Sequence, residues 1–259
     1  MNILVILGAL LIGLSLGLLG SGGSIITVPL LIYVLEQPAK LAVAESLIIV
    51  GCISTFSGAG YIKRGLVNWK FVLLFGLPSM LGTYFGAWVS QYVSGLLQLM
   101  TFSIVMLLAS RTMFSSVTEL PIEALPPRNP VIIVAGVVVG ILAGFVGIGG
   151  GFLIVPALFL LGKLAMPNAI GTSLIIITMQ SFTGFFKYQM VLEKFDMAVN
   201  WEIVFSIVLI GIAGSILGIR MADKMPQQKI RTLFGYALVI LGTYIFLTSI
   251  YHMFLLGEV

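Results

Sequence analysis

The chain has 259 residues, of which 59% are hydrophobic and only 8% are charged, and its mean hydropathy is +1.18. So few charges cannot cover the surface of a soluble domain of this size, so the composition excludes a water-soluble globular protein and predicts a membrane protein. The net charge of +4 comes without a dense basic stretch interleaved with aromatic residues, which argues against a nucleic-acid partner.

Long apolar segments follow one another along the whole chain, joined by short connections. Inside a bilayer the backbone polar groups must be satisfied within each segment, so these segments are predicted to be helices. They also lack the alternation of apolar and polar residues that is typical of membrane barrel strands. The segments cover residues 2–19, 24–35, 40–61, 69–90, 95–115, 130–147, 152–163, 168–186, 200–221 and 231–254. We therefore expect an all-α polytopic membrane protein with eight to ten helical segments.

One polar connector divides the chain into two parts. It runs from Ser116 to Asn129 with the sequence SVTELPIEALPPRN, and its three prolines prevent a helix from continuing. We predict a first transmembrane repeat at 1–115, a cytoplasmic linker at 116–129 and a second transmembrane repeat at 130–259. The two repeats together are expected to form one integrated membrane domain.

The two parts resemble each other in sequence. GSGGSIITVP begins at Gly20, and GIGGGFLIVP begins 127 residues later at Gly147. In the same register, the sequence SLII begins at Ser46 and again at Ser173. After an insertion of five residues, further matching pairs are Asn68 and Asn200, Gly82 and Gly214, and Gly86 and Gly218. Similarity over most of both halves indicates a duplicated membrane fold.

The positions of the basic residues predict that the two repeats are inverted. In the first half, basic residues flank the connection between the third and fourth segments, at Lys63, Arg64 and Lys70. In the second half they cluster one connection later, at Arg220, Lys224, Lys229 and Arg231. Since Lys and Arg are retained in cytoplasmic loops, the halves point in opposite directions and both termini are expected outside the cytoplasm. Each half then has either five crossings or one re-entrant hairpin followed by three spans.

Two short segments, 24–35 and 152–163, point to a substrate site. Each has twelve residues, which is about 18 Å of helix and less than the roughly 30 Å thickness of a bilayer core. Each follows a glycine cluster, and interrupted segments at matching positions of two repeats mark the binding site in many secondary transporters. A helix that begins inside the membrane presents free N–H groups and the positive end of its dipole to an anion.

The site is therefore predicted to bind a small anion. The backbone donors are expected at Gly22, Gly23, Ser24, Gly149, Gly150 and Gly151. Side-chain donors at a similar depth are expected at Ser46, Thr172, Ser173 and Gln180. Glu45 is a carboxyl inside a span and is a candidate for carrying a coupled proton.

Other interpretations of these residues stay open at this point. The glycines can simply allow helices to approach, which is the role we expect for Gly82, Gly86, Gly214 and Gly218. The hydroxyls can bond to the backbone of their own helices. Glu45 can be a solvated group near the outer interface.

The sequence lacks the signatures of an enzyme. It contains neither an H-E-x-x-H motif nor a phosphate-binding loop motif. Its single cysteine, Cys52, and single histidine, His252, exclude an intrachain disulfide and a cysteine–histidine metal cluster. We expect neither enzymatic activity nor a bound metal or cofactor.

The paired glycine motifs resemble a known family. GLLGSGGSIITVPLL and GFVGIGGGFLIVPAL, each followed by a helix of small and polar residues, are similar over nearly the whole chain to the sulfite exporter TauE/SafE family. The resemblance implies a permease of the bacterial inner membrane that exports a sulfur-containing anion such as sulfite, sulfoacetate or a related organosulfonate. In that membrane, the charge pattern described above predicts periplasmic termini. The chain departs from the usual pattern in its first half, where Ser24 replaces a third glycine and Glu45 precedes Ser46. Alternatives are an uptake permease for another small anion, an anion channel, and a membrane subunit of a larger complex.

Overall fold

The computed structural model describes residues 3–21, 23–114, 129–147, 151–222, 224 and 226–255. Within these ranges every regular element is helical, and each expected apolar segment corresponds to one continuous helical segment. The first half contains α1 (Ile3–Leu19), α2 (Gly23–Pro29) continued by the π-helical η1 (Leu30–Val34), α3 (Ala39–Lys63), α4 (Trp69–Phe71) continued by η2 (Val72–Gly76) and α5 (Leu77–Ser90), and α6 (Gly95–Phe114). The second half contains α7 (Asn129–Val146), α8 (Gly151–Leu160), α9 (Met166–Glu193), α10 (Trp201–Ala222) and α11 (Gln227–Leu255).

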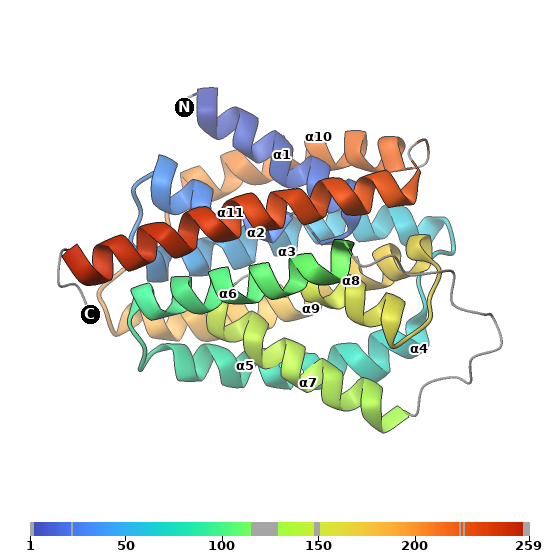
Figure 1. Ribbon diagram of the computed structural model, residues 1–259, viewed down its shortest axis with the longest axis horizontal. Coiled ribbons are helices and arrows are strands. Elements are labelled where there is room, and N and C mark those ends of the chain that lie inside the picture. Colours follow the sequence, from blue (N-terminus) through green and yellow to red (C-terminus); the bar gives the residue numbers. More distant parts are fainter. Residues whose placement is uncertain are drawn as a thin grey trace.

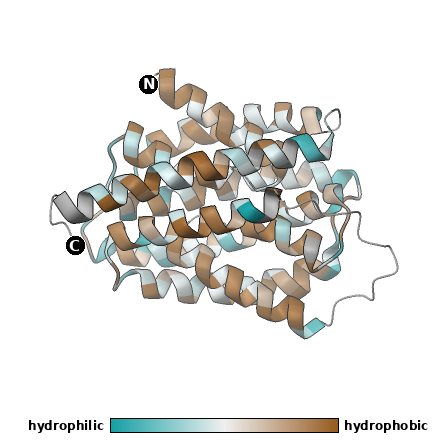
Figure 2. Cartoon of the chain, viewed as in Figure 1, coloured by the Kyte–Doolittle hydropathy of each residue, from teal (hydrophilic) through white to brown (hydrophobic). Residues whose placement is uncertain are grey.

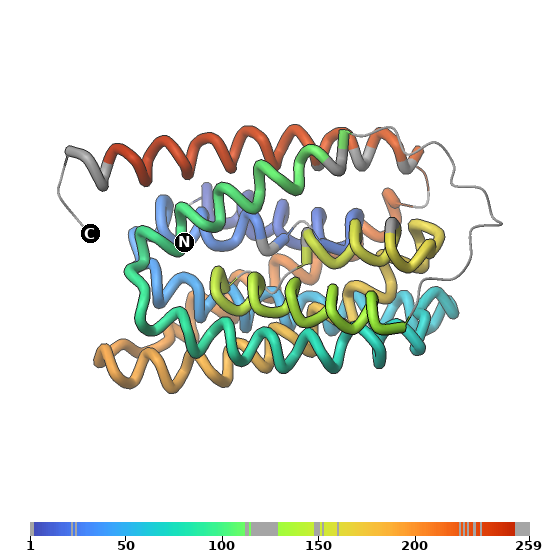
Figure 3. Tube along the Cα trace, turned by 60° about the horizontal axis from the view of Figure 1, so that its bottom comes forward, coloured from blue at the N-terminus to red at the C-terminus, as the bar shows by residue number. Residues whose placement is uncertain are grey.

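The long helices lie roughly along one axis, and their connections gather at two ends of the bundle (Figures 1 and 3). At one end, Lys40 Nζ lies 3.5 Å from the Gln91 carbonyl oxygen, and Lys194 Nζ donates to Gln91 Oε1 at 2.6 Å. We call this the Gln91 end. At the other end, the backbone N–H of Asn68 donates to Thr172 Oγ1 at 2.9 Å, and we call this the Asn68 end. Each end of the bundle therefore brings together connections that lie far apart in the chain.

The composition of the helices suits a lipid environment. Five helical segments are long and apolar enough to cross a membrane: Ala39–Lys63, Trp69–Ser90, Asn129–Val146, Met166–Glu193 and Trp201–Ala222. Large apolar side chains such as Leu81 (75% exposed) and Leu209 (69% exposed) lie on the outside, and hydrophobic residues predominate along the helices in Figure 2. Such a surface is stable against lipid and not against water. The predicted all-α, multi-pass membrane class is therefore confirmed.

Glycine allows two helix pairs to pack backbone against backbone. A Cβ atom on Gly13 of α1 would lie 1.8 Å from the Gly211 carbonyl oxygen of α10. A Cβ atom on Gly144 of α7 would lie 2.0 Å from the Thr83 carbonyl oxygen of α5. The packing role predicted from small-x-x-x-small spacing is confirmed, since an added Cβ would meet backbone atoms at each of Gly82, Gly86, Gly214 and Gly218.

The chain reverses direction after α1. Gly20 has a φ of +66°, in the left-handed region that glycine adopts without strain. The following α2 returns along α1, because Gly23 lies against Leu16 and, farther on, Gly8 lies against Leu30. The first half thus begins with a helical hairpin whose second arm, Gly23–Val34, is short.

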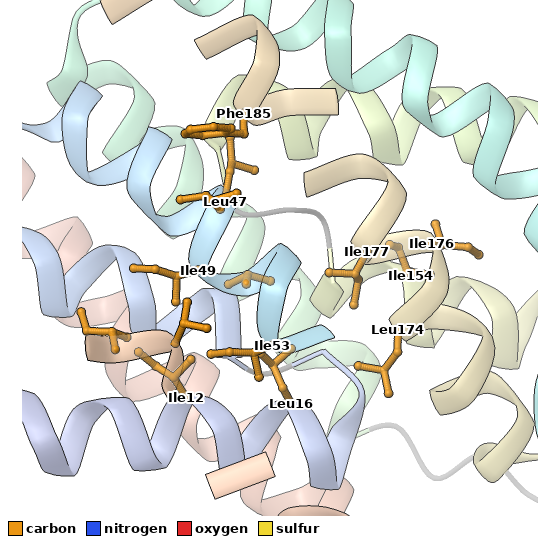
Figure 4. Close-up of a cluster of buried hydrophobic side chains, with 14 of the residues drawn as sticks. Ile12, Leu16, Leu47, Ile49, Ile53, Ile154, Leu174, Ile176, Ile177 and Phe185 are labelled. Atoms are coloured by element: carbon orange, nitrogen blue, oxygen red, sulfur yellow. The ribbon is translucent and has the colours of Figure 1, made fainter. Parts of the chain in front are cut away.

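The helices form a central pair with flanking layers. The most deeply buried long helices are α3 and α9, which pack against each other where Gly58 lies against Leu174 and Gly184 lies against Leu47. Figure 4 shows Leu47 and Leu174 among the buried apolar side chains. On one side, α6 and α11 pack together along the upper edge in Figure 3 and enclose Ile25 and Val28 of α2. The largest difference from the expected boundaries is in α9, which continues to Glu193, seven residues beyond the apolar segment that ends at 186. The last helix, α11, also begins at Gln227, four residues before its expected segment.

Candidate functional site

The glycine clusters of the two halves touch each other. Gly151, the first residue of α8, lies so close to Ser21 that an added Cβ would be 3.0 Å from the Ser21 carbonyl oxygen. The same Cβ would be 2.9 Å from Cδ1 of Ile177 in α9. Gly22, Gly149 and Gly150 lie outside the described residues, as does the side chain of Ser24. We call residues 20–23 and 147–151 the glycine turns, and their contact places the start of α8 beside the first turn.

Two serines at equivalent positions each bond to the glycine turn of the opposite half. Ser46 Oγ in α3 donates to the Gly147 carbonyl oxygen at 2.8 Å. Ser173 Oγ in α9 donates to the Gly20 carbonyl oxygen at 2.9 Å. Both glycines have positive φ, and both hydroxyls also lie within 2.8 Å of a carbonyl oxygen one turn back in their own helix. Each hydroxyl has a single hydrogen, and in this structure its acceptors are a carbonyl of its own helix and a carbonyl of the opposite glycine turn. The two serines therefore position the turns.

Removing one of these hydroxyls is expected to loosen its turn. Ser46→Ala or Ser173→Ala should lower the free energy of unfolding by about 1 kcal/mol, because a buried carbonyl loses a donor. Transport should slow severalfold as the turn loses its fixed orientation, measured as initial rates in proteoliposomes. The control is Ser57→Ala, since Ser57 is also buried in α3 but donates only to the Ile53 carbonyl oxygen of its own helix. Equal rates in Ser46→Ala, Ser173→Ala and Ser57→Ala would contradict the positioning role.

A second pair of equivalent residues, Glu45 and Thr172, bonds to the connections that precede α10 and α4. Thr172 Oγ1 accepts from the Asn68 backbone N–H at the Asn68 end, and Glu45 Oε1 accepts from the Asn200 backbone N–H at 2.7 Å near the Gln91 end. Asn68 and Asn200 in turn cap the helices that follow, accepting from the N–H groups three residues on. Glu45 is fully buried, and its Oε2 has no hydrogen-bond partner in the described part of the chain. Thr172 and Glu45 therefore lie toward opposite ends of the bundle.

Three polar side chains near the middle of α3 and α9 are buried without partners in the described ranges. Gln180, Ser181 and Ser54 are each 0% exposed, and both amide atoms and both hydroxyls lack a hydrogen-bond partner among the residues that the structure describes. Ser181 faces α3, because a Cβ on Gly51 would be 3.1 Å from Ser181 Cβ. Gln180 is one turn along α9 from Ile177, which contacts Gly151.

Two tyrosines that sequence reasoning missed hold the carbonyls just before the glycine turns. Tyr61 Oη donates to the Gly17 carbonyl oxygen at 3.2 Å, and Tyr188 Oη donates to the Phe145 carbonyl oxygen at 3.1 Å. Gln98 Nε2 also donates to the Phe145 oxygen, at 2.9 Å. The tyrosines are 127 positions apart, as are Ser54 and Ser181, so the repeat offset is the signal that finds both pairs. Across the described ranges, no group of His, Cys, Asp and Glu is arranged to hold a metal ion.

Comparison with known proteins places the chain among membrane transporters. A probable membrane transporter protein of Xylella fastidiosa is 29% identical over 246 residues, which cover 91% of each chain. The probable membrane transporter protein YunE of Bacillus subtilis is 30% identical over 265 residues, which cover 93% of this chain and 95% of YunE. A probable membrane transporter protein of Methanocaldococcus jannaschii is 26% identical over 252 residues. No solved structure matches the chain.

The family comparison covers nearly the whole chain. The sequence model described as sulfite exporter TauE/SafE matches residues 5–245, a range that includes both glycine turns. The resemblance seen in the paired glycine motifs is thereby confirmed, and the chain belongs to the sulfite exporter TauE/SafE family of membrane transporters.

Proposed function

We propose that the chain is a secondary transporter that exports a small sulfur-containing anion, such as sulfite, sulfoacetate or a related organosulfonate, across the bacterial inner membrane. The observation that carries this proposal is the contact between Gly151 and Ser21, which brings the two glycine turns together. Because α8 begins at Gly151, the free N–H groups of its first turn would lie beside this contact, where an oxyanion can accept from them. The predicted backbone donors from both halves would surround the same anion.

We also propose that residues 1–115 and 130–259 are inverted repeats joined by the 116–129 linker. Reciprocal packing supports this: α1 packs on α10, while the equivalent α7 packs on α5. The central pair α3 and α9 and the outer pair α6 and α11 each join equivalent helices. The paired bonds from Ser46 and Ser173 are reciprocal in the same way. Such an arrangement permits alternating access around a site between the repeats.

The orientation follows from the charges. Lys63, Arg64 and Lys70 lie at the Asn68 end, so the rule that positive loops face the cytoplasm assigns that end to the inside. The beginning of α1 and the end of α11 lie toward the opposite end in Figures 1 and 3. Both termini are then periplasmic.

A substrate panel in proteoliposomes tests the proposed function. Counterflow of labelled sulfite would be measured against unlabelled sulfite, sulfoacetate, taurine, sulfate, thiosulfate and small carboxylates. We expect saturable exchange with one or more sulfur anions and none with carboxylates. Exchange confined to carboxylates would reject the proposed substrate class, and flux that does not saturate would indicate a channel.

Glu45 provides a test of proton coupling. Its Oε2 makes no hydrogen bond among the described residues, although the Gln37 side chain lies near the carboxylate, so a proton on that oxygen would remove a buried charge that is only partly compensated. We expect Glu45→Gln to abolish accumulation driven by an imposed pH gradient while counterflow continues, because the glutamine oxygen can still accept from Asn200 N–H. The control is Glu202→Gln, an exposed acid in the first turn of α10. Accumulation that still follows the pH gradient in Glu45→Gln would exclude this role.

A further inference from the structure

Side chains of the first half hold the connection between α9 and α10. This connection covers residues 194–200, and we call it the α9–α10 connection. Lys194 Nζ donates to Gln91 Oε1 at 2.6 Å. Lys40 Nζ lies 3.9 Å from the centroid of the Phe195 ring, which is within the range of a cation–π contact. These two contacts join the halves of the chain at the Gln91 end.

The α9–α10 connection also packs inward on the bundle. Met197 and Val199 are partly buried and pack against the hydrophobic core. The backbone N–H of Asn200 donates at 2.7 Å to Oε1 of Glu45, which is fully buried in α3. The connection therefore covers part of the core and is bonded to a central helix.

One turn of α3 contacts both this connection and a glycine turn. Glu45 accepts from Asn200, and the next residue, Ser46, donates to the Gly147 carbonyl oxygen at 2.8 Å. Val43 lies on the other side of the same glycine, since a Cβ on Gly147 would overlap the Val43 side chain. A displacement of this glycine turn would therefore reach the α9–α10 connection through two adjacent residues.

An equivalent arrangement exists at the Asn68 end. The connection between α3 and α4, residues 64–68, is called here the α3–α4 connection. The N–H of Asn68 donates to Thr172 Oγ1 at 2.9 Å, and the next residue of α9, Ser173, donates to the Gly20 carbonyl oxygen at 2.9 Å. The apolar side chains of this connection that pack against the core are Leu66 and Val67. Each glycine turn is thus linked through a central helix to one end of the bundle.

We infer that the α9–α10 and α3–α4 connections are the two gates of the transporter. The pairs Glu45–Ser46 and Thr172–Ser173 couple each gate to an anion bound between the glycine turns. The inference rests on the proposed function of the chain as a sulfur-anion transporter. An anion that accepts from the turns shifts the carbonyls that the serines hold, and the residue beside each serine passes the shift to a gate. Alternating access requires such gates on both sides of the site, and in this structure both are bonded to the central helices.

A covalent link between the halves tests the gate at the Gln91 end. Gln91→Cys and Lys194→Cys, whose parent side chains are in contact, are combined with Cys52→Ala, which removes the native cysteine. A short bismaleimide joins them in detergent before reconstitution, because sulfite cleaves disulfides but not thioethers. We expect labelled sulfite counterflow to fall at least about tenfold on linkage, since the gate can no longer open.

The control links two positions inside one connection of the first half. Gln91→Cys joined to Ser94→Cys, in the same Cys52→Ala background, should keep more than about half of its unlinked rate. Lys194→Cys alone, treated with the same reagent, should do the same. Counterflow at the unlinked rate in the fully linked Gln91→Cys/Lys194→Cys protein, with linkage measured by mass spectrometry, would overturn the gate.

Spin labels test the coupling between gate and site. Maleimide labels at Gln91→Cys and Lys194→Cys report the distance across the gate by double electron–electron resonance. We expect saturating sulfite to change this distance distribution, and Ser46→Ala to reduce the change at least about threefold. Ser173→Ala, which alters the link to the opposite end, should leave the change intact. Equal responses in the two serine variants would reject coupling through these residues.

Failure of the inference is distinguishable from failure of the proposed function. Sulfite exchange that survives the link between the halves would reject the gate and leave the transporter function in place. Absence of exchange for every sulfur anion in the unlinked wild type would reject the proposed function and the inference with it.

Discussion

Replacing Gly151 with leucine is expected to reduce transport to the background of empty liposomes while the protein still folds. Gly151 lies where the two glycine turns touch, and an added Cβ would meet both the Ser21 backbone, at 3.0 Å, and Ile177, at 2.9 Å. A leucine side chain would occupy the place where an anion meets the N–H groups of α8. Since Gly151 is the first residue of the short helix α8, the long helix pairs that stabilise the fold would remain in contact. Initial rates of sulfite counterflow in proteoliposomes, at equal reconstituted protein, measure the effect.

A glycine of α3 provides the matched control. An added Cβ on Gly60 would have only Ile219 Cδ1 within 4 Å, at 3.7 Å, and the position is half-exposed, so Gly60→Leu should transport like the wild type. Gly151→Ala should give an intermediate rate, because one methyl group at 3.0 Å from a backbone oxygen requires only a small displacement. A fully active Gly151→Leu would mean that the anion does not bind between the turns.

Much of the architecture follows from the sequence because its causes are local. The helices begin and end where apolar runs meet glycine, proline or polar residues, and the predicted breaks before Gly23 and Gly151 are present in the structure. The extension of α9 was not predicted, because Lys187 and Tyr188 end the apolar run. In the structure Tyr188 is buried against Gln98 and Phe145, so tertiary contacts continue the helix where hydropathy does not.

The site could be predicted only in part, because the hydrogen-bond partners of its serine and carboxyl side chains are residues far away in the sequence. The hydroxyls of Ser46 and Ser173 were expected beside a ligand, and the structure directs them to Gly147 and Gly20 in the opposite half. The connection between Glu45 and Asn200 joins residues 155 positions apart, which no local pattern reveals. The repeat offset, by contrast, is visible in the sequence and links both serines. For a buried polar residue in one repeat, the position 127 residues away therefore indicates which residue makes the equivalent contact in the other repeat.

The tightest helix pairs give the largest expected effect on stability. Gly13→Ala places a methyl group 1.8 Å from the Gly211 carbonyl oxygen, and Gly144→Ala places one 2.0 Å from the Thr83 carbonyl oxygen. The atoms in the way are backbone, so a helix must move, and each variant should lose about 3 kcal/mol of unfolding free energy. The two sites lie in different helix pairs, so the losses should add to about 6 kcal/mol in the double variant, comparable to the whole stability of many proteins.

Thermal unfolding in detergent, with size-exclusion profiles, measures this prediction. The control is Gly76→Ala, whose methyl group would meet only the side chains of Ile176 and Met179, at 3.4 Å and beyond, and should unfold within a few degrees of the wild type. Gly13→Ala and Gly144→Ala should unfold at clearly lower temperatures and the double variant should aggregate. Because the equivalent contacts are α1 with α10 and α7 with α5, similar losses from the two single variants would also support the duplicated architecture. A double variant as stable as Gly76→Ala would show that the backbones are farther apart than glycine-mediated packing requires.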